Sequence, residues 1–139
     1  MKLEADLIMN LRVDIGTFQE LGETSHGNLK VIPITGGSFS GPQLKGTIVP
    51  GGADWNKLMG GSVRHIFAKY TLLTDDGEYI SIENEGYSEE NEPRPKIRTV
   101  PKFIVSENSR YKFLQGGVFV GSLEKGDGDF VKISIYKLK

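Results

Sequence analysis

The sequence contains no cysteine, which excludes disulfide bonds and thiolate chemistry. It also has little net charge, because 17 Lys and Arg oppose 18 Asp and Glu and leave a formal value of −1. This balance argues against a general binder of nucleic acid or of anionic membranes. With two histidines and no cysteine, the preferred ligands of zinc are too few for a zinc site. We therefore expect neither a metal nor a cofactor.

Long apolar runs are also missing from the chain. No segment is long enough to span a bilayer, and Glu4 and Asp6 interrupt the N-terminal stretch where a secretory signal would be apolar. We therefore expect a cytoplasmic protein. No segment keeps an apolar period of 3.6 residues, so at most one short helical turn is expected, at residues 54–59. The length suits a single domain over residues 1–139.

Glycine, in contrast, is abundant. The chain has 18 glycines in 139 residues, nearly twice the usual share of about 7%. Diglycines stand at residues 36–37, 51–52, 60–61 and 116–117. Glycine between segments rich in Val, Ile, Tyr and Phe indicates β-structure with bulges and sharp bends. A phosphate-binding loop would need a helix after the glycines, and no amphipathic helix follows any of them.

Alternating apolar and polar residues predict most of the chain to be strand. In residues 7–15 apolar side chains alternate with Asn10, Arg12 and Asp14, the pattern of a half-buried strand. Further strands are expected at residues 29–34, 44–49, 63–73, 78–84, 96–105, 111–120 and 130–138. Eight or nine short-linked strands predict an all-β domain, and we expect a closed antiparallel β-barrel.

One hairpin is specific enough to predict its register. Residues 74–77, Thr-Asp-Asp-Gly, have the pattern of a type I turn with a glycine bulge. This turn places Ile80, Ile82 and Asn84 on the inner face. On the outer face it pairs Lys69 with Glu83, which is a favourable cross-strand pair.

The register predicts polar side chains inside the barrel. Tyr70 lies opposite Ile82 on the inner face, together with Asn84. Alternation along residues 111–115 would add Gln115 to the interior. Buried polar groups need hydrogen-bond partners, so these side chains either satisfy one another or bind a ligand. Both interpretations remain open at this point.

Asp54 and Trp55 form the most suggestive chemical pair. A carboxylate beside a large aromatic ring could act as a general acid or base with a raised pKa. Alternatively, Asp54 caps a helical turn while Trp55 closes the barrel end. A hydrolytic trio of Ser62, His65 and Asp54 is a weaker hypothesis, because no nucleophile elbow surrounds Ser62.

The glycine-rich block resembles the signature of a known family. Residues 36–46 read Gly-Gly-x-Phe-x-Gly-Pro-x-Leu-x-Gly, and residues 50–55 read Pro-Gly-Gly-Ala-Asp-Trp. The resemblance continues through residues 69–70, 74–77, 82–86, 98–103, 111–121 and 131–138. It is to an uncharacterised family of small bacterial and fungal proteins, a domain of unknown function. The resemblance implies an antiparallel barrel with a central cavity and no established activity.

Two departures from the family pattern concern the expected pocket. This chain has Lys69 where members typically have Arg, and Phe113-Leu114-Gln115 where they usually carry Trp-Leu-Asn. Phe113 fills less space than Trp and cannot donate a hydrogen bond. Gln115 reaches one methylene further than Asn. A changed ligand preference is expected if these residues line the pocket.

Three functions follow as hypotheses. The first is a small-molecule-binding barrel whose polar pocket is lined by Tyr70, Asn84 and Gln115, with Asp54, Trp55 and Arg98 near its mouth. Simple alternation would turn Arg98 outward unless Pro101 marks a bulge. The second is a cofactor-free isomerase, cyclase or lyase in which Asp54 or Tyr70 transfers a proton. The third is a structural, homo-oligomer-forming module with a filled core.

Overall fold

The computed structural model describes residues 1–139, which form nine β-strands and one short 3-10 helix. The strands are β1 (Ala5–Ile15), β2 (Gln19–Thr24), β3 (Gly27–Ser40), β4 (Lys45–Met59), β5 (Val63–Thr74), β6 (Tyr79–Glu89), β7 (Ile97–Ile104), β8 (Phe119–Lys125) and β9 (Phe130–Leu138). The helix η1 (Lys112–Gln115) lies between β7 and β8. No helix of the protein has the length and apolar character needed to cross a membrane.

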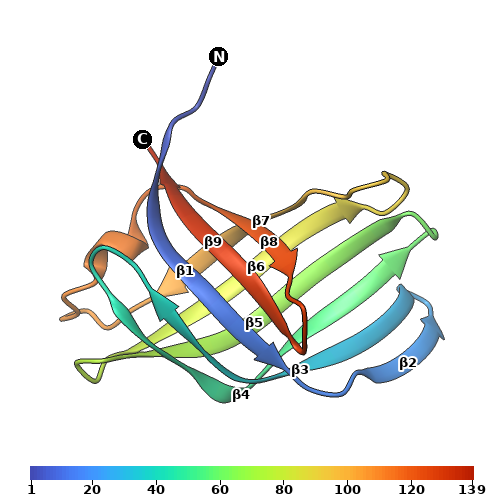
Figure 1. The fold of residues 1–139 in the computed structure, drawn as a ribbon, viewed down its shortest axis with the longest axis horizontal. Coiled ribbons are helices and arrows are strands. Elements are labelled where there is room, and N and C mark those ends of the chain that lie inside the picture. The colour runs from blue at the N-terminus through green and yellow to red at the C-terminus, as the bar shows by residue number, and fades with distance from the viewer.

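The strands close into an antiparallel barrel, as the sequence predicted (Figure 1). They follow the order β1-β9-β8-β7-β6-β5-β4-β3, and β3 pairs again with β1. Eight of the nine strands thus form the ring, while β2 pairs only with β3. Ring closure leaves β2 as the one strand outside the ring, with a free edge along its length.

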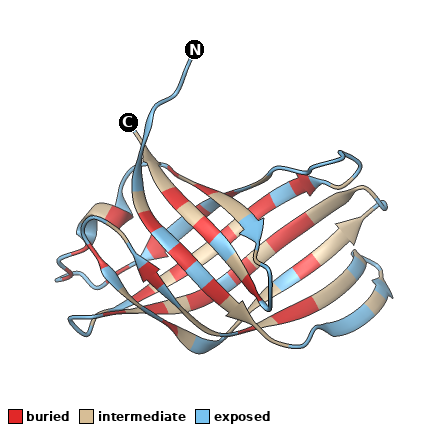
Figure 2. Ribbon diagram, viewed as in Figure 1, coloured by how far each residue is buried: buried red, intermediate tan, exposed pale blue.

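The core fills the barrel interior through the alternation of side chains along each strand. Figure 2 shows buried and exposed positions alternating along the strands. The buried cluster includes fully enclosed residues of β1, β5, β6 and β9, namely Met9, Leu72, Ile80, Ile82 and Ile135. Their burial removes apolar surface from water, which provides the main driving force for folding.

The predicted hairpin register is confirmed. Lys69 pairs with Glu83, and their Nζ and Oε1 atoms are 3.3 Å apart on the outer face. Ile80, Ile82 and Asn84 all lie inside. The amide of Gly77 donates to the carbonyl of Thr74 at 2.9 Å, and Gly77 has a φ of +89°, which favours glycine.

Three segments differ from the prediction. Residues 54–59 form no helical turn, because β4 continues past an irregularity at residues 50–52 and pairs with β3 and β5 on both sides. Residues 111–115 form no strand, because η1 and the following diglycine precede β8. The edge strand β2 was missed, because residues 19–24 are mostly exposed and lack apolar alternation.

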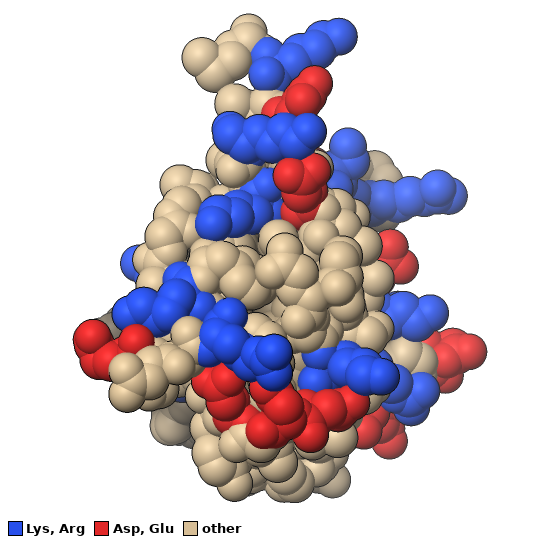
Figure 3. Space-filling model, turned by 90° about the vertical axis from the view of Figure 1, so that its left-hand side faces the viewer, with Lys and Arg blue, Asp and Glu red and all other residues tan.

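The two ends of the barrel differ. The helix η1 and the β5–β6 turn both lie at the left-hand end in Figure 1, and η1 buries Leu114. Tyr111 and Arg110 donate hydrogen bonds to Asp76 at 2.7 and 2.9 Å. Bonds from Thr74, Tyr111 and Arg110 hold the pKa of Asp76 well below its usual range. Figure 3 looks at this end, where acidic and basic side chains lie next to one another. The other end is open.

Candidate functional site

A cavity of about 220 Å³ opens at the end of the barrel opposite η1. Its wall is mainly apolar and includes Val13, Ile32, Ile34, Ile66, Ala68, Ile97, Leu123, Phe130, Val131 and Ile133. These side chains come from strands on all sides of the ring, so the cavity is the unfilled part of the barrel interior. A concave, mainly apolar cavity with a few polar groups is the usual form of a small-molecule site.

Buried oxygens without partners lie at the inner part of this cavity. Tyr70 and Asn84 line the cavity and are only 3% and 1% exposed. Neither the Tyr70 hydroxyl nor the Asn84 Oδ1 has a hydrogen-bond partner. Thr99 Oγ1, one strand further, is also buried without a partner. Nearly all buried polar groups in folded proteins are hydrogen-bonded. The Tyr70 and Asn84 oxygens on the cavity wall are therefore available to pair with a bound molecule.

Glycine at position 121 makes room beside two of these oxygens. Thr99 pairs with Gly86 on one side and with Gly121 on the other, and all three positions face inward. A Cβ atom at Gly121 would lie 2.2 Å from Thr99 Oγ1 and 3.8 Å from Asn84 Oδ1. Any larger residue would collide with Thr99. The Thr99 and Asn84 oxygens thus both lie near Gly121 inside the barrel.

Asp54 lies on the cavity wall in register with Ala68, which in turn pairs with Asn84. Its Oδ1 accepts a hydrogen bond from the Phe67 amide at 3.0 Å, and its Oδ2 accepts one from Asn56 Nδ2 at 3.0 Å. Burial raises the pKa of the Asp54 carboxyl despite these two bonds. Burial and, less strongly, the Asp54 charge also raise the pKa of Tyr70.

A chain of polar contacts leads from Asp54 to the mouth. Asn56 Oδ1 accepts a bond of 2.5 Å from Arg64, whose Nε donates to Glu90 Oε1 at 2.7 Å. Lys30 and Lys125 complete the charged rim of the cavity. The rim is thus polar and the interior apolar.

The structure brings together three of the six residues predicted for the site. Tyr70, Asn84 and Asp54 line one cavity. Trp55 does not line it: the residue is 51% exposed, because β4 is a continuous strand and the neighbour of an inward residue points outward. Placing Trp55 at the barrel mouth was wrong.

Arg98 also lies outside. β7 keeps a regular register through Pro101, so no bulge turns Arg98 inward, and its NH1 donates to Ser122 Oγ at 3.2 Å on the surface. The expectation of Arg98 at the mouth was therefore wrong. The cause is the plain alternation of side chains along β7.

Gln115 lies at the closed end, in η1, and not in the cavity. Its Nε2 donates to the Phe103 carbonyl at 2.5 Å and its Oε1 accepts from the Val105 amide at 3.5 Å. β8 pairs with only residues 97–99 of β7. The Gln115 amide therefore acts as a substitute for a strand partner at the end of β7, and placing it in the pocket was wrong.

The cavity rim contains residues that the sequence analysis missed, namely Lys30, Asn56, Arg64, Glu90 and Lys125. Alternation was the available signal for most of them, since Lys30, Arg64 and Lys125 are each two residues from an inward apolar side chain of the same strand. Which strand ends meet at the open end does not follow from alternation.

Other groups with catalytic residue types do not form a site. His65 points outward, where its Nε2 lies 2.7 Å from Glu85 Oε2 and its ring stacks on Tyr87. Asp54 points into the barrel, so the trio of Ser62, His65 and Asp54 is not assembled. No group of three or more His, Asp or Glu side chains is arranged to hold a metal ion.

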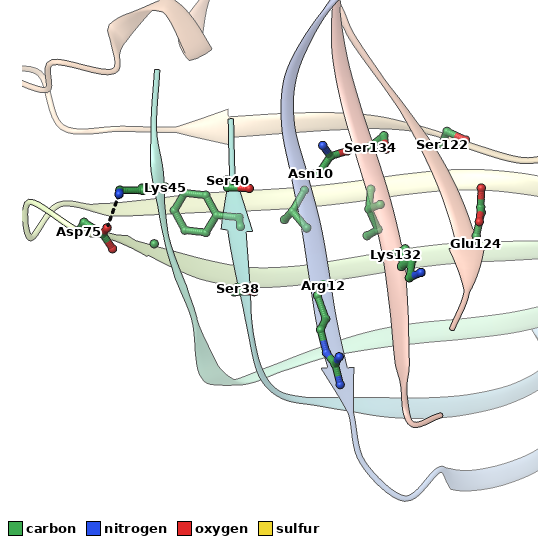
Figure 4. Close-up of a pocket in the computed structure, with 14 residues that line it drawn as sticks. Asn10, Arg12, Ser38, Ser40, Lys45, Asp75, Ser122, Glu124, Lys132 and Ser134 are labelled. Carbon is green, nitrogen blue, oxygen red and sulfur yellow. Dashed lines mark hydrogen bonds and ion pairs between the residues drawn. The ribbon is translucent and has the colours of Figure 1, made fainter. Parts of the chain in front are cut away.

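A larger hollow of about 550 Å³ lies on the outer surface across β9, β1 and β3 (Figure 4). It is wide open, and two pairs of its polar side chains already contact one another. Ser134 Oγ donates to Asn10 Oδ1 at 2.7 Å, and Lys45 Nζ lies 3.9 Å from Asp75 Oδ2. None of the buried unpartnered oxygens belongs to it. The interior cavity is therefore the candidate site.

Comparison with known proteins places the chain among uncharacterised relatives. A UPF0311 protein of Rhodopseudomonas palustris is 30% identical over 150 residues, covering 98% of this chain and 97% of its own length. A crystal structure of a conserved protein of unknown function from the same organism matches with a TM-score of 0.89 at 29% identity, over 100% of this chain and 99% of that one.

Two further solved structures share the fold. A β-barrel-like protein of Acinetobacter baumannii has a TM-score of 0.89 at 31% identity, over 100% of this chain and 98% of that one. A structure described as an enzyme from Penicillium herquei has a TM-score of 0.77 at 16% identity, over 99% and 96% of the two chains, which shows the fold alone. The family described as protein of unknown function, DUF3237, matches residues 3–138, and the chain belongs to it.

Proposed function

We propose that the barrel binds a small organic molecule in the cavity at its open end. The observation that carries this proposal is the pair of buried oxygens, on Tyr70 and Asn84, that lack any hydrogen-bond partner on the wall of an apolar cavity. Leaving such a group unpaired costs about 1–3 kcal/mol. A bound ligand that supplies donors would recover that free energy. A structural module with a filled core would leave no such cavity.

The test is a fragment screen by ¹H–¹⁵N NMR on the wild-type protein and on the Asn84→Leu variant. Fragments that bind are expected to shift the amide signals of Ile66, Ala68 and Asn84 together. Because the Asn84 Oδ1 accepts no hydrogen bond in the protein, replacement of Asn84 by the similarly sized Leu should leave the melting temperature unchanged or raised. The same change should weaken donor-bearing fragments roughly tenfold or more, since one hydrogen bond to a buried acceptor is lost.

The outcome that contradicts the proposal is equally specific. Signals that move only around Asn10 and Ser134 would assign binding to the outer hollow. Equal affinity of every fragment for the wild type and for Asn84→Leu would make the unpartnered amide irrelevant to binding. Either result would remove the interior cavity as the ligand site.

A second candidate function is proton transfer on the bound molecule, as in a cofactor-free isomerase, cyclase or lyase. The observation that favours it is an Asp54 carboxyl whose pKa is raised by burial on the wall that also presents the unpartnered Tyr70 hydroxyl. A carboxyl with a raised pKa exchanges protons more readily near neutral pH. Turnover lost in Asp54→Asn while binding persists would establish this function.

The raised pKa of Asp54 also predicts how stability depends on pH. The pKa of Asp54 in the folded protein lies above the unfolded value of about 3.9. At any pH between these two pKa values, folding is therefore accompanied by uptake of a proton. The stability of the wild type relative to Asp54→Asn is therefore expected to fall as pH rises through the folded pKa. Urea unfolding of both proteins from pH 3.5 to 7 measures this difference.

The comparison with Asp54→Asn is needed because Asp76 titrates with the opposite sign. Its lowered folded pKa makes stability fall as the solution becomes more acidic. Asp76 is present in both proteins, so its contribution cancels in the difference. A difference that does not change with pH would show that burial does not perturb the Asp54 carboxyl.

A further inference from the structure

Three cationic side chains surround the mouth of the cavity. Lys30 of β3, Arg64 of β5 and Lys125 of β8 all line it. Each stands two positions from an apolar wall residue of the same strand, toward the open end of the barrel. Strand alternation therefore directs all three basic groups to the same rim, where they meet any molecule that enters.

Only one of these cations is neutralised by the protein. Arg64 Nε lies 2.7 Å from Glu90 Oε1. Lys30 and Lys125 take part in no ion pair. Lys30 is partly buried, and its Nζ lies 4.5 Å from the centre of the Phe18 ring, a favourable position for a cation.

The unneutralised charges disfavour one another. Burial lowers the pKa of Lys30, and the positive charges of Arg64 and Lys125 lower it further, more than the negative charges of Glu20 and Asp54 raise it. A protein gains no stability from like charges gathered around a partly buried opening. An anion between the two lysines would turn this repulsion into attraction, through charge-assisted hydrogen bonds.

The inner end of the cavity, opposite the mouth, favours an uncharged hydrogen-bonding group of the ligand. Tyr70 and Asn84 present unpartnered oxygens there, and Asn84 Oδ1 can only accept a hydrogen bond. Between the two ends the wall is apolar. The volume of about 220 Å³ corresponds to about seven liquid water molecules at roughly 30 Å³ each. That volume suits one aromatic ring with a short side chain.

We propose that the ligand is an amphipathic carboxylate, an inference that rests on the function proposed above. Its carboxylate lies between Lys30 and Lys125 at the mouth, its apolar body fills the cavity, and a hydroxyl at its far end donates to Asn84. A single negative charge matches the site better than a phosphate dianion, because Asp54 and Glu90 also line the cavity and would repel the second charge.

The experiment uses cinnamate, 4-hydroxycinnamate and the primary amide of each as probes, titrated by NMR. Each acid is expected to bind about tenfold more tightly than its amide, because the amide lacks the charge that Lys30 and Lys125 attract. Lys30→Met should remove this preference without loss of thermal stability. Lys132→Met, an exposed lysine on the outer face of β9, is the matched control and should keep it.

The hydroxyl group tests the proposed orientation. The wild type is expected to bind 4-hydroxycinnamate several-fold more tightly than cinnamate, whereas Asn84→Leu should bind both acids equally. If the amides bind as well as the acids, or if Lys30→Met keeps the preference, the carboxylate proposal is overturned while cavity binding stands. If neither acids nor amides shift the signals of Ile66, Ala68 and Asn84, the proposed function falls as well.

Discussion

Replacing Gly37 by alanine is expected to lower the free energy of unfolding by about 4 kcal/mol, one of the largest effects of any single methyl group in this chain. Gly37 pairs with Val13 where β3 meets β1 and closes the barrel. Its φ is +134°, and an added Cβ would lie 2.0 Å from the Arg12 carbonyl oxygen. The methyl group would therefore force the two strands apart at the closure.

A matched control separates backbone strain from this collision. Gly51 has a similar φ of +120°, but an added Cβ there would meet no atom within 4 Å. Gly51→Ala is expected to cost only the conformational strain, about 1–3 kcal/mol. Denaturant unfolding of both variants measures the difference. Equal losses would show that the close approach of β3 to β1 contributes nothing.

The same close approach explains the glycine spacing of residues 36–52. A Cβ at Gly41 would lie 1.9 Å from the Ile8 carbonyl oxygen, and one at Gly46 would lie 2.0 Å from that of Leu73. Strands of a closed barrel approach one another tightly where the sheet bends. At Gly37, Gly41 and Gly46 the glycine spacing thus marks places where only hydrogen fits between neighbouring strands, whereas a Cβ at Gly51 would have room.

Local sequence patterns, such as turn motifs and strand alternation, predicted the fold because each depends on only a few neighbouring residues. The Thr-Asp-Asp-Gly turn determines the register from Lys69 to Glu83, and that register places Asn84 and Tyr70 inside. The error at residues 54–59 had a local cause as well. Pro50-Gly51-Gly52 breaks the alternation, so the second half of β4 was not recognised as a strand. Trp55 was misplaced for that reason.

The rest of the site depends on contacts between distant segments. Gln115 lies in the 3-10 helix η1, and its side-chain amide forms hydrogen bonds with the Phe103 carbonyl and the Val105 amide at the end of β7. No alternation pattern along the sequence reveals these bonds. Lys30, Arg64 and Lys125 follow the alternation of their own strands. Their meeting at one rim follows only from ring closure, which brings β3, β5 and β8 around a common opening.

Replacing Ala68 by phenylalanine is expected to abolish ligand binding, with a loss in affinity of at least about a hundredfold. Ala68 lies on the cavity wall between Asp54 and Asn84. A phenyl ring at this position would occupy the space of about 220 Å³ that the proposed ligand needs. Because the ring enters an existing cavity, overpacking should change the free energy of unfolding by less than about 2 kcal/mol.

Lys69→Phe is the matched control, since it adds the same ring one residue away on the outer face of β5. It removes only an exposed ion pair with Glu83, which is worth at most about 1 kcal/mol. NMR titration with the fragments that bind the wild type, together with thermal unfolding, measures both properties. A folded Ala68→Phe protein that binds with wild-type affinity would show that the ligand lies elsewhere. The unpartnered oxygens of Tyr70 and Asn84 would then be a cost of the fold, with no part in binding.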